Sequence, residues 1–325
     1  MLSCRKKKSP EIVPQISGVF VAGNDSDQYG NPVAAYWKDG VLMVLSSKYS
    51  QTTGIFISGN SVYISGHQAE GNAQYWRDDK VVHLTKDEQP AYAAAICISG
   101  NDVYVAGLKN FDGVLESAMY WKNDVPVRLT DGTSKVTISG IAVSGNDVYV
   151  VGSEHSPGNS TVNAKYWKNG KAVSLAANTN NSYANDITVT GNDVYIAGWE
   201  LTPDNHSIAK YWKNGIPVNL SAGNTHEKAT AITAIGNDIY VSGDRATLSN
   251  TSMAQYWKNG VSVSLTSGDT RAYTSDIAVY GGDVFVSGTE AAPNGKYVAK
   301  YWKNSTAVNL TDGTRDAYAG SIAVK

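Results

Sequence analysis

The sequence lacks the features that mark several common protein classes. It contains two cysteines in 325 residues, Cys4 and Cys97, and two cysteines cannot form a disulfide framework. Charged residues make up 17% of the chain and its formal net charge is −2, which removes the electrostatic case for binding nucleic acid. No apolar run reaches the ~18 residues that a membrane-spanning helix needs. These shortages exclude a disulfide-stapled domain, a nucleic-acid-binding protein and a helical membrane protein.

Phenylalanine and methionine are also scarce, with four residues of each type, whereas the chain has 31 glycines and 20 tyrosines. Glycine and tyrosine at this frequency favour strands and tight turns over packed helices. Because 42% of the residues are hydrophobic, the chain has enough apolar surface to bury a core and is not expected to be disordered.

The dipeptide Tyr-Trp recurs at a nearly constant interval. Its seven tryptophans are Trp37, Trp76, Trp121, Trp167, Trp212, Trp257 and Trp302. Successive spacings are 39, 45, 46, 45, 45 and 45 residues, so seven copies of one unit cover almost the whole chain.

Each repeat contains four segments in which apolar and polar residues alternate. In one copy they read "DITVTG", "NDVYIAG", "AKYWKNG" and "IPVNL", which fall within residues 186–220. A period of two with β-branched and aromatic residues predicts strands. The first and second strands are joined by "SGND"-type turns and the third and fourth by "KNG", and both sequences are typical of tight hairpins.

Seven repeats of a four-stranded antiparallel unit predict an all-β fold, a seven-bladed β-propeller over residues 15–325. Residues 1–14 are interpreted as a flexible tail or a lipoprotein linker. A solenoid is the alternative, but solenoids need polar capping repeats, and the last repeat here is as apolar as the middle ones.

The two ends of the chain supply complementary strands. The segment "AYAGSIAVK" at the C-terminus is a first strand with no second strand after it, and "SGVFVAG" near the N-terminus is a second strand with no clean first strand before it. We therefore predict that the C-terminal strand completes the first blade. The segment near Ile12 has the spacing to fill the same slot, but Pro14 removes a ladder donor there.

The repeat "GNDVYVAG…AxYWKNGxxVxLT" resembles the blades of bacterial extracytoplasmic seven-bladed propeller proteins. This resemblance implies export to the periplasm or the cell surface. The opening "MLSCRKKKSPE" is similar to the end of a bacterial lipoprotein signal, although the charged and apolar regions of a signal do not precede it. It implies lipidation at Cys4 and a membrane-anchored lipoprotein; the alternative is a free thiol in the tail.

Loop lengths divide the predicted propeller into two faces. The distance from each repeat tryptophan to the fourth-strand leucine is eight residues in every repeat, so the hairpin turns form what we call the rigid face. The connections between second and third strands, and between repeats, form the variable face. Loops on a rigid scaffold carry most binding groups, so the variable face is the candidate for function.

A cation follows every repeat tryptophan on the rigid face, and the aspartates of the "SGND" turns lie on the same face. These aspartates should largely offset the cations. We interpret the ring of charge as a solubility feature rather than a binding surface.

Two positions near the start of the first strand should ring the mouth of the central channel. Four residues before the first-strand isoleucine lie Gln51, Tyr92, Thr137, Tyr183, Lys228, Tyr273 and Tyr318. One residue before it lie Gly54, Ala95, Gly140, Asp186, Ala231, Asp276 and Ser321. Tyrosines beside acids suit a polar small molecule, a sugar or a peptide.

Trp199 stands outside the repeat and opens a loop on the same face, where it either contacts a ligand or pins its own loop. The predicted ligand-binding residues are Tyr92, Tyr183, Asp186, Trp199, Lys228, Tyr273, Asp276 and Tyr318. The alternative is that the tyrosines only cover the tops of the blades.

Signals for catalysis and for metals are weak, since the five histidines are scattered and none has ligand spacing. We predict no catalytic residue, no metal and no cofactor. The expected function is a non-enzymatic binding propeller of the bacterial cell envelope, a monomer whose partner is a glycan, peptide or protein, with no nucleic acid and with membrane contact only through Cys4. The alternative is a propeller lyase or glycoside hydrolase with carboxylates at the channel mouth.

Overall fold

The computed structural model describes residues 17–325 except 69–70, 86–88, 111–115, 157–160, 177–179 and 250. The expected tail at residues 1–14, with Cys4, Ile12 and Pro14, lies outside the described residues. The elements of regular structure in the described residues are all β-strands. The described part of the chain contains no helix long and apolar enough to cross a membrane.

The strands are β1 (Val19–Ser26), β2 (Pro32–Lys38), β3 (Val41–Ser58), β4 (Ser61–Gln68), β5 (Asn72–Arg77), β6 (Lys80–His83), β7 (Ala91–Ser99), β8 (Asp102–Lys109), β9 (Ser117–Lys122), β10 (Val125–Arg128), β11 (Val136–Ser144), β12 (Asp147–His155), β13 (Val162–Lys168), β14 (Lys171–Ser174), β15 (Ser182–Thr190), β16 (Asp193–Leu201), β17 (Ser207–Lys213), β18 (Ile216–Asn219), β19 (Glu227–Ile235), β20 (Asp238–Ala246), β21 (Ser252–Lys258), β22 (Val261–Ser264), β23 (Ala272–Tyr280), β24 (Asp283–Ala291), β25 (Tyr297–Lys303), β26 (Thr306–Asn309) and β27 (Tyr318–Val324).

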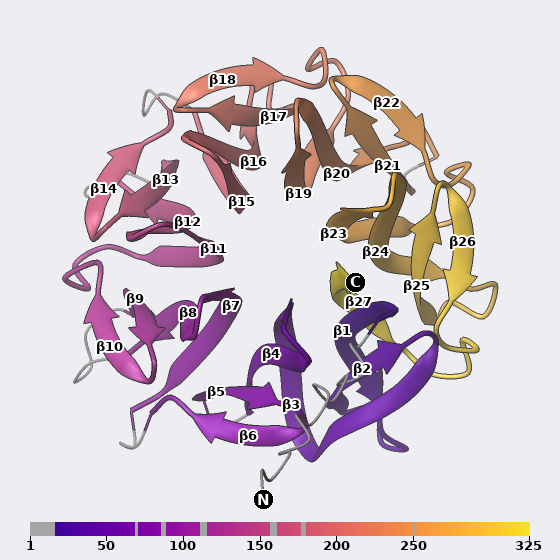
Figure 1. The fold of residues 1–325 in the computed structure, drawn as a ribbon. Coiled ribbons are helices and arrows are strands. Elements are labelled where there is room, and N and C mark those ends of the chain that lie inside the picture. The colour runs from indigo at the N-terminus through magenta and orange to yellow at the C-terminus, as the bar shows by residue number, and fades with distance from the viewer. Residues whose placement is uncertain are drawn as a thin grey trace, which may run out of the picture.

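The sheets stand side by side around a central opening, and this arrangement confirms the prediction of an all-β propeller built from antiparallel sheets (Figure 1). Five sheets have four strands each, for example β15-β16-β17-β18. The sixth has seven strands in the order β27-β1-β2-β3-β4-β5-β6. In the four-stranded sheets β7, β11, β15, β19 and β23 lie innermost, and the last strand of each sheet lies at the rim (Figure 1).

Strand β3 gives the larger sheet its seven strands. Its first part pairs with β2, from Val41 opposite Lys38 to Tyr49 opposite Val33. Its second part, Ser50–Ser58, pairs with β4 instead. The same strand is therefore an outer strand for β2 and an inner strand for β4.

The first and last described strands pair with each other, as the sequence predicts. Val19 of β1 lies opposite Val324 of β27, and the ladder continues to Asn24 opposite Tyr318. Beyond the ladder, Gly18 and Lys325 exchange two backbone hydrogen bonds of 2.8 and 3.1 Å. Backbone pairing between the ends of the chain thus closes the ring.

The hairpin turns have the backbone that their sequences require. Asn169 and Gly170 in a "KNG" turn have φ values of 50° and 81°, in the left-handed region that Asn and Gly tolerate. The side chain of Asn169 also accepts a hydrogen bond from the Val148 amide at 2.9 Å, which fastens this turn to the neighbouring one.

The core lies between adjacent sheets. The seven repeat tryptophans are 1–2% exposed, which confirms that they are packing residues. In one interface Tyr149 and Val151 of β12 pack with Ile187 of β15 and Trp212 of β17. Each sheet therefore buries its apolar face against the next sheet rather than in one shared centre.

Five of the cations of the rigid face are paired with turn aspartates. Lys122 and Asp102 are 2.9 Å apart, and Lys213 and Asp193 are 2.8 Å apart. The same pairing recurs for Lys168, Lys258 and Lys303. The turn aspartates thus offset these cations, as expected from the sequence.

Candidate functional site

A polar cavity of about 290 Å³ lies on the central axis, where the inner strands converge. Its lining includes all seven residues that precede the inner-strand isoleucine: Gly54, Ala95, Gly140, Asp186, Ala231, Asp276 and Ser321. The structure therefore places this set in the central channel. Five of the seven are glycine, alanine or serine, so the two carboxyl groups dominate the chemistry of the cavity.

A β-bulge in each acid-bearing strand precedes the acid. The register of β15 shifts between Ala184 and Asp186, and that of β23 shifts between Thr274 and Asp276. A bulge inserts one unpaired residue and re-aims the side chains beside it. This local irregularity positions the carboxyl groups in the channel.

Both carboxyl groups accept hydrogen bonds from the next inner strand. Asp186 accepts one from the Ile232 amide of β19 at 2.8 Å. Asp276 accepts one from the Ser321 hydroxyl at 2.6 Å and one from the Ile322 amide at 2.9 Å, both on β27. Each acid thus joins its own sheet to the neighbouring sheet while it lines the channel.

The channel shifts the ionisation of both acids. Burial, with a smaller contribution from the charge of Asp276, raises the pKa of Asp186 to about 8. Burial also raises the pKa of Asp276. Because the two carboxyl groups interact, they titrate as a pair, and the pair carries less than its full negative charge near neutral pH.

The residues four positions before the isoleucine lie elsewhere, and none of them lines the central cavity. The structure does not bring Tyr183 and Asp186 into one cavity, although the sequence suggested that they act together. Tyr92 is also outside the channel, with its ring edge-on to His67 at a centroid distance of 5.2 Å.

Trp199 lies between two of the other predicted site residues. The sequence placed it at the opening of a loop, but β16 continues to Leu201, and Trp199 pairs with Tyr183 across the sheet. Their rings stack at 4.0 Å with an interplanar angle of 18°. The Lys228 ammonium lies 4.4 Å from the centroid of the Trp199 ring. Trp199 is therefore held by contacts with Tyr183 and Lys228.

Two other predicted tyrosines share a cavity of about 340 Å³ beside the channel. Tyr273 and Tyr318 line it together with Tyr297, whose ring centroid is 6.5 Å from that of Tyr273 and 5.6 Å from that of Tyr318. Ser275 and Gly320 line both this cavity and the central one. The tyrosines of this region therefore adjoin the channel without lining it.

Sequence reasoning missed Asp244, which follows the glycine near the end of β20. Its carboxylate accepts hydrogen bonds from the Thr274 amide at 2.7 Å and the Thr274 hydroxyl at 3.2 Å. Burial raises the pKa of Asp244 to about 7. The signal in the sequence was the residue after each second-strand glycine, since Asn24 and Ser153 at that position likewise accept hydrogen bonds from backbone amides of the next repeat's inner strand.

No group of three His, Cys, Asp or Glu side chains suited to a metal ion occurs among the residues described. Cys97 is largely enclosed, and burial raises the pKa of its thiol to about 11. A thiol in this environment is a poor nucleophile near neutral pH.

Comparison with known proteins identifies the fold but no family. No family model matches the sequence, and no curated protein matches it. Among solved structures, a puromycin-hydrolysing peptidase from Mycobacterium tuberculosis superposes with a TM-score of 0.61 at 10% identity, over 92% of this chain and 53% of that one. The acylaminoacyl peptidase of Pyrococcus horikoshii gives 0.59 at 11% identity, over 92% and 52%.

The β-propeller domain of the trilobed protease from Pyrococcus furiosus gives a TM-score of 0.57 at 11% identity and covers 97% of that domain and 93% of this chain. The chain thus spans about half the length of the two peptidases and nearly all of the isolated propeller domain. Identities this low show a shared fold alone.

These comparisons correct the functional expectation. The sequence suggested a non-enzymatic binding propeller of the cell envelope, whereas the structures described above are peptidases or part of a protease. They also differ in chemistry from the lyase or glycoside hydrolase named as the alternative.

Proposed function

We propose that this chain is the propeller component of a peptidase system, and that its central channel receives the protonated amino end of a peptide. The observation that carries the proposal is the pair Asp186 and Asp276 in a cavity on the axis of a fold shared with peptidases. In this proposal the catalytic groups belong to a separate unit.

The length comparison supports a division of labour. The two peptidases are about twice as long as the part that this chain covers, and the protease propeller domain matches it nearly end to end. A propeller of this kind would supply peptide access and orientation to a catalytic domain.

The chemistry of the channel supports an amine as the group bound. Glycine, alanine and serine side chains leave space near the axis, and a cavity of about 290 Å³ is at the lower end of the usual range for ligand sites. A bound ammonium group favours the ionised form of nearby carboxyls. Binding would therefore draw a proton from the Asp186–Asp276 pair, which is partly protonated near neutral pH.

We also propose that the ring has seven blades, because the seven-stranded sheet can be counted as two blades that share β3. The strands β27, β1, β2 and the first part of β3 then form one blade, and the rest of β3 with β4, β5 and β6 forms the next. With the five four-stranded sheets this makes seven blades. The Tyr-Trp repeat, which occurs seven times, supports that count.

Calorimetric titration of the whole chain with tetra-alanine amide tests the proposal. The free amino form should bind, and comparison between buffers of different ionisation enthalpy should reveal proton release. N-acetylated tetra-alanine amide should bind at least 10-fold more weakly. Equal binding of the two peptides would contradict the proposal.

Matched variants locate the site. Asp186→Asn and Asp276→Asn each remove a carboxylate but retain an oxygen that accepts the backbone hydrogen bond, and each should weaken binding at least 10-fold. Asp102→Asn on the rigid face should leave binding unchanged. If Asp102→Asn weakens binding as much as the channel variants, the amine does not bind in the channel.

A further inference from the structure

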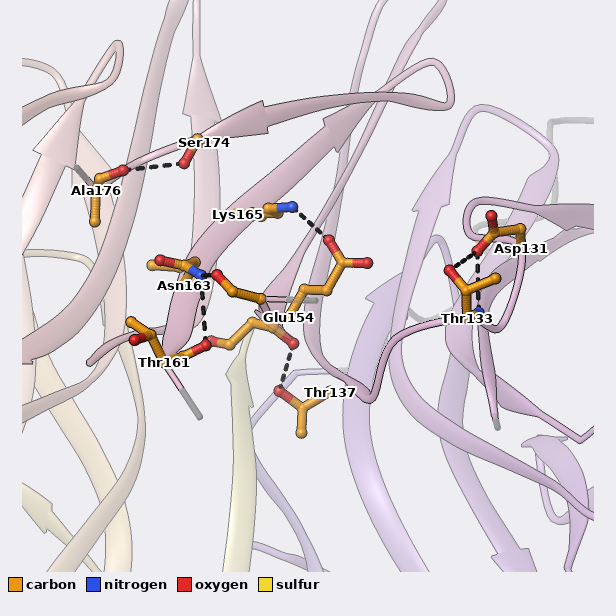
Figure 2. A network of polar contacts seen from close by, with 12 residues as sticks. Asp131, Thr133, Thr137, Glu154, Thr161, Asn163, Lys165, Ser174 and Ala176 are labelled. Carbon is orange, nitrogen blue, oxygen red and sulfur yellow. Dashed lines mark hydrogen bonds and ion pairs between the residues drawn. The ribbon is translucent and has the colours of Figure 1, made fainter. Parts of the chain in front are cut away.

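In β12, β16 and β24 the second residue after the glycine of the strand is a glutamate that forms an ion pair. In three sheets this glutamate pairs with a lysine two residues before the repeat tryptophan. The pairs are Glu154 with Lys165, Glu200 with Lys210, and Glu290 with Lys300. Figure 2 shows the Glu154–Lys165 pair, where the ammonium group points directly at the carboxylate. In these three sheets the charge at this position is neutralised within the sheet.

The sheet β19-β20-β21-β22 departs from that pattern. Arg245 occupies the glutamate position on β20, and Gln255 occupies the lysine position on β21. Glu227 lies opposite Arg245 in the register, but its two oxygens accept hydrogen bonds from Gln255 and Thr225, each at 2.9 Å. Within the described part of the chain Arg245 has no ion pair, and its hydrogen-bonding contact is the Met253 sulfur at 4.0 Å.

Arg245 lines a cavity of about 550 Å³ on the variable face together with His206 and His226. The two imidazole rings come from different connections, and their centroids are 5.0 Å apart. Backbone bonds hold these groups in place, since the Ala246 amide donates to the His226 carbonyl at 2.8 Å and the His206 amide donates to the Thr202 hydroxyl at 3.0 Å. Three nitrogen-bearing side chains from separate segments therefore converge on one cavity.

The rest of the lining is both polar and apolar. Asn224, Thr225 and Ser267 add hydrogen-bonding groups, whereas Met253 is buried against the cavity and Leu248 stands fully exposed at its edge. A bare inorganic anion would leave these apolar side chains without a partner. An organic anion would use both parts of the lining.

We propose that this cavity binds an organic carboxylate, with Arg245 holding both carboxylate oxygens and Met253 and Leu248 contacting an apolar substituent. The planar guanidinium group matches a carboxylate in a two-pronged geometry that a lysine does not provide. His206 and His226 donate further hydrogen bonds to the same group. The site is separate from the channel and does not depend on the function proposed for it.

Titration of the whole chain with N-acetyl-leucine, followed by protein NMR, tests the site. N-acetyl-leucine should shift the resonances of residues that line the cavity, and N-acetyl-leucinamide, which lacks the carboxylate, should not. Arg245→Gln should weaken binding at least 10-fold, and His226→Gln should weaken it about 3-fold. The matched control is Arg315→Gln, an exposed arginine between β26 and β27, which should bind as the unaltered chain does.

Three outcomes would overturn the proposal. They are equal shifts with the acid and the amide, unchanged binding in Arg245→Gln with an unchanged melting temperature, and binding of inorganic phosphate without binding of N-acetyl-leucine. If Arg245→Gln does not fold, the 3-fold loss in His226→Gln decides the question, because His226 is exposed and its replacement removes no buried contact.

Discussion

At the scale of single residues, the carboxyl groups at the centre of the ring link stability to pH. An aspartate in an unfolded chain ionises near pH 3.9, whereas the pKa of Asp186 in the folded chain is raised to about 8. The folded state therefore binds more protons than the unfolded state between these values. The stability contributed by the protonated group is complete below about pH 4 and is lost as the pH rises through 8.

We expect the chain to melt at a lower temperature at pH 8.5 than at pH 5, and Asp186→Asn should reduce that difference by roughly 2–4 °C, a shift equivalent to ~1 kcal/mol in a domain of a few hundred residues. Asn mimics the protonated acid at every pH. Scanning calorimetry across this range measures the effect. Asp244, whose pKa is raised to about 7, changes stability in the same direction and keeps some dependence in the variant.

The control for this experiment is Asp102→Asn, since Asp102 is exposed and the Lys122 and Asn123 side chains lower its pKa. Its replacement should not flatten the profile between pH 5 and 8.5. A profile that is flat in the unaltered chain would contradict the assignment of raised pKa values to the channel.

Gly198 is a second position where one atom decides stability. A Cβ at this position would lie 1.9 Å from the Tyr183 carbonyl oxygen and 2.9 Å from the Trp212 ring. Neither the paired backbone nor the buried tryptophan can move away without breaking the sheet. Gly198→Ala should therefore destabilise the chain by at least about 2–4 kcal/mol, within the range for overpacked or strained core sites.

Urea denaturation of Gly198→Ala, with Gly170→Ala as the control, checks this expectation. A Cβ at Gly170 has open space around it, and its cost comes from the positive φ of 81° alone. We expect about 1 kcal/mol there. An equal loss in both variants would show that close packing at Gly198 is unimportant.

Some of these site residues and their contacts could be predicted from the sequence, and others could not. Asp186 and Asp276 were located in the channel because the position before the inner-strand isoleucine is constant in all repeats. The stacking of Tyr183 on Trp199 was not predicted because the sequence placed Trp199 in a loop, whereas β16 continues through it and pairs it with Tyr183. The contact of Lys228 with Trp199 was not predicted because Lys228 belongs to the next sheet. Contacts between repeats have no signature within one repeat, which is also why the cavity around Arg245 was missed.

At the scale of elements, β27 is the strand whose loss should matter most. Deleting residues 314–325 removes the ladder with β1 and exposes the apolar cluster that contains Val21, Trp37 and Ile322. The free edge of β1 would also be open to pairing with other chains. We expect a large loss of stability and aggregation, measured by thermal melting and light scattering.

A truncated chain that melts like the full chain would contradict this expectation and would give the closing role to the segment near Ile12. The control is replacement of Lys325 alone by alanine, which removes a partly buried side chain that donates to the Gly59 carbonyl but leaves the ladder intact. Its melting temperature should stay within about 1 °C of the unaltered chain.

Strand β3 illustrates what a regular repeat does not reveal. The hairpins were predictable because Asn-Gly and "SGND" sequences encode their turns locally. The continuous passage through Tyr49 was not predicted, but it has a clear physical basis. Ten residues separate Leu45 from Ile55, whereas twelve separate Leu84 from Ile96 and the corresponding residues of later repeats. The shorter connection leaves no room for a separate turn, so the chain crosses from one sheet position to the next as one extended strand.

At the scale of the whole molecule, lipidation of Cys4 stays a prediction. With a bacterial export signal fused ahead of Leu2 and expression in a Gram-negative host, the chain should carry lipid at Cys4 and fractionate with membranes. Mass spectrometry of the mature N-terminus measures the modification. Cys4→Ser is the matched control, and equal membrane recovery of the two forms would rule out the anchor.

The pairing of β1 with β27 also delays ring closure during synthesis. A ribosome completes Val19 about 300 residues before its ladder partner Val324. At the usual 5–20 residues per second that delay is roughly 15–60 s. During this interval the nascent chain holds an open edge that no local partner can cover. The edge of β1 therefore stays unpaired until β27 leaves the ribosome, and a product that stops before β27 cannot close its ring.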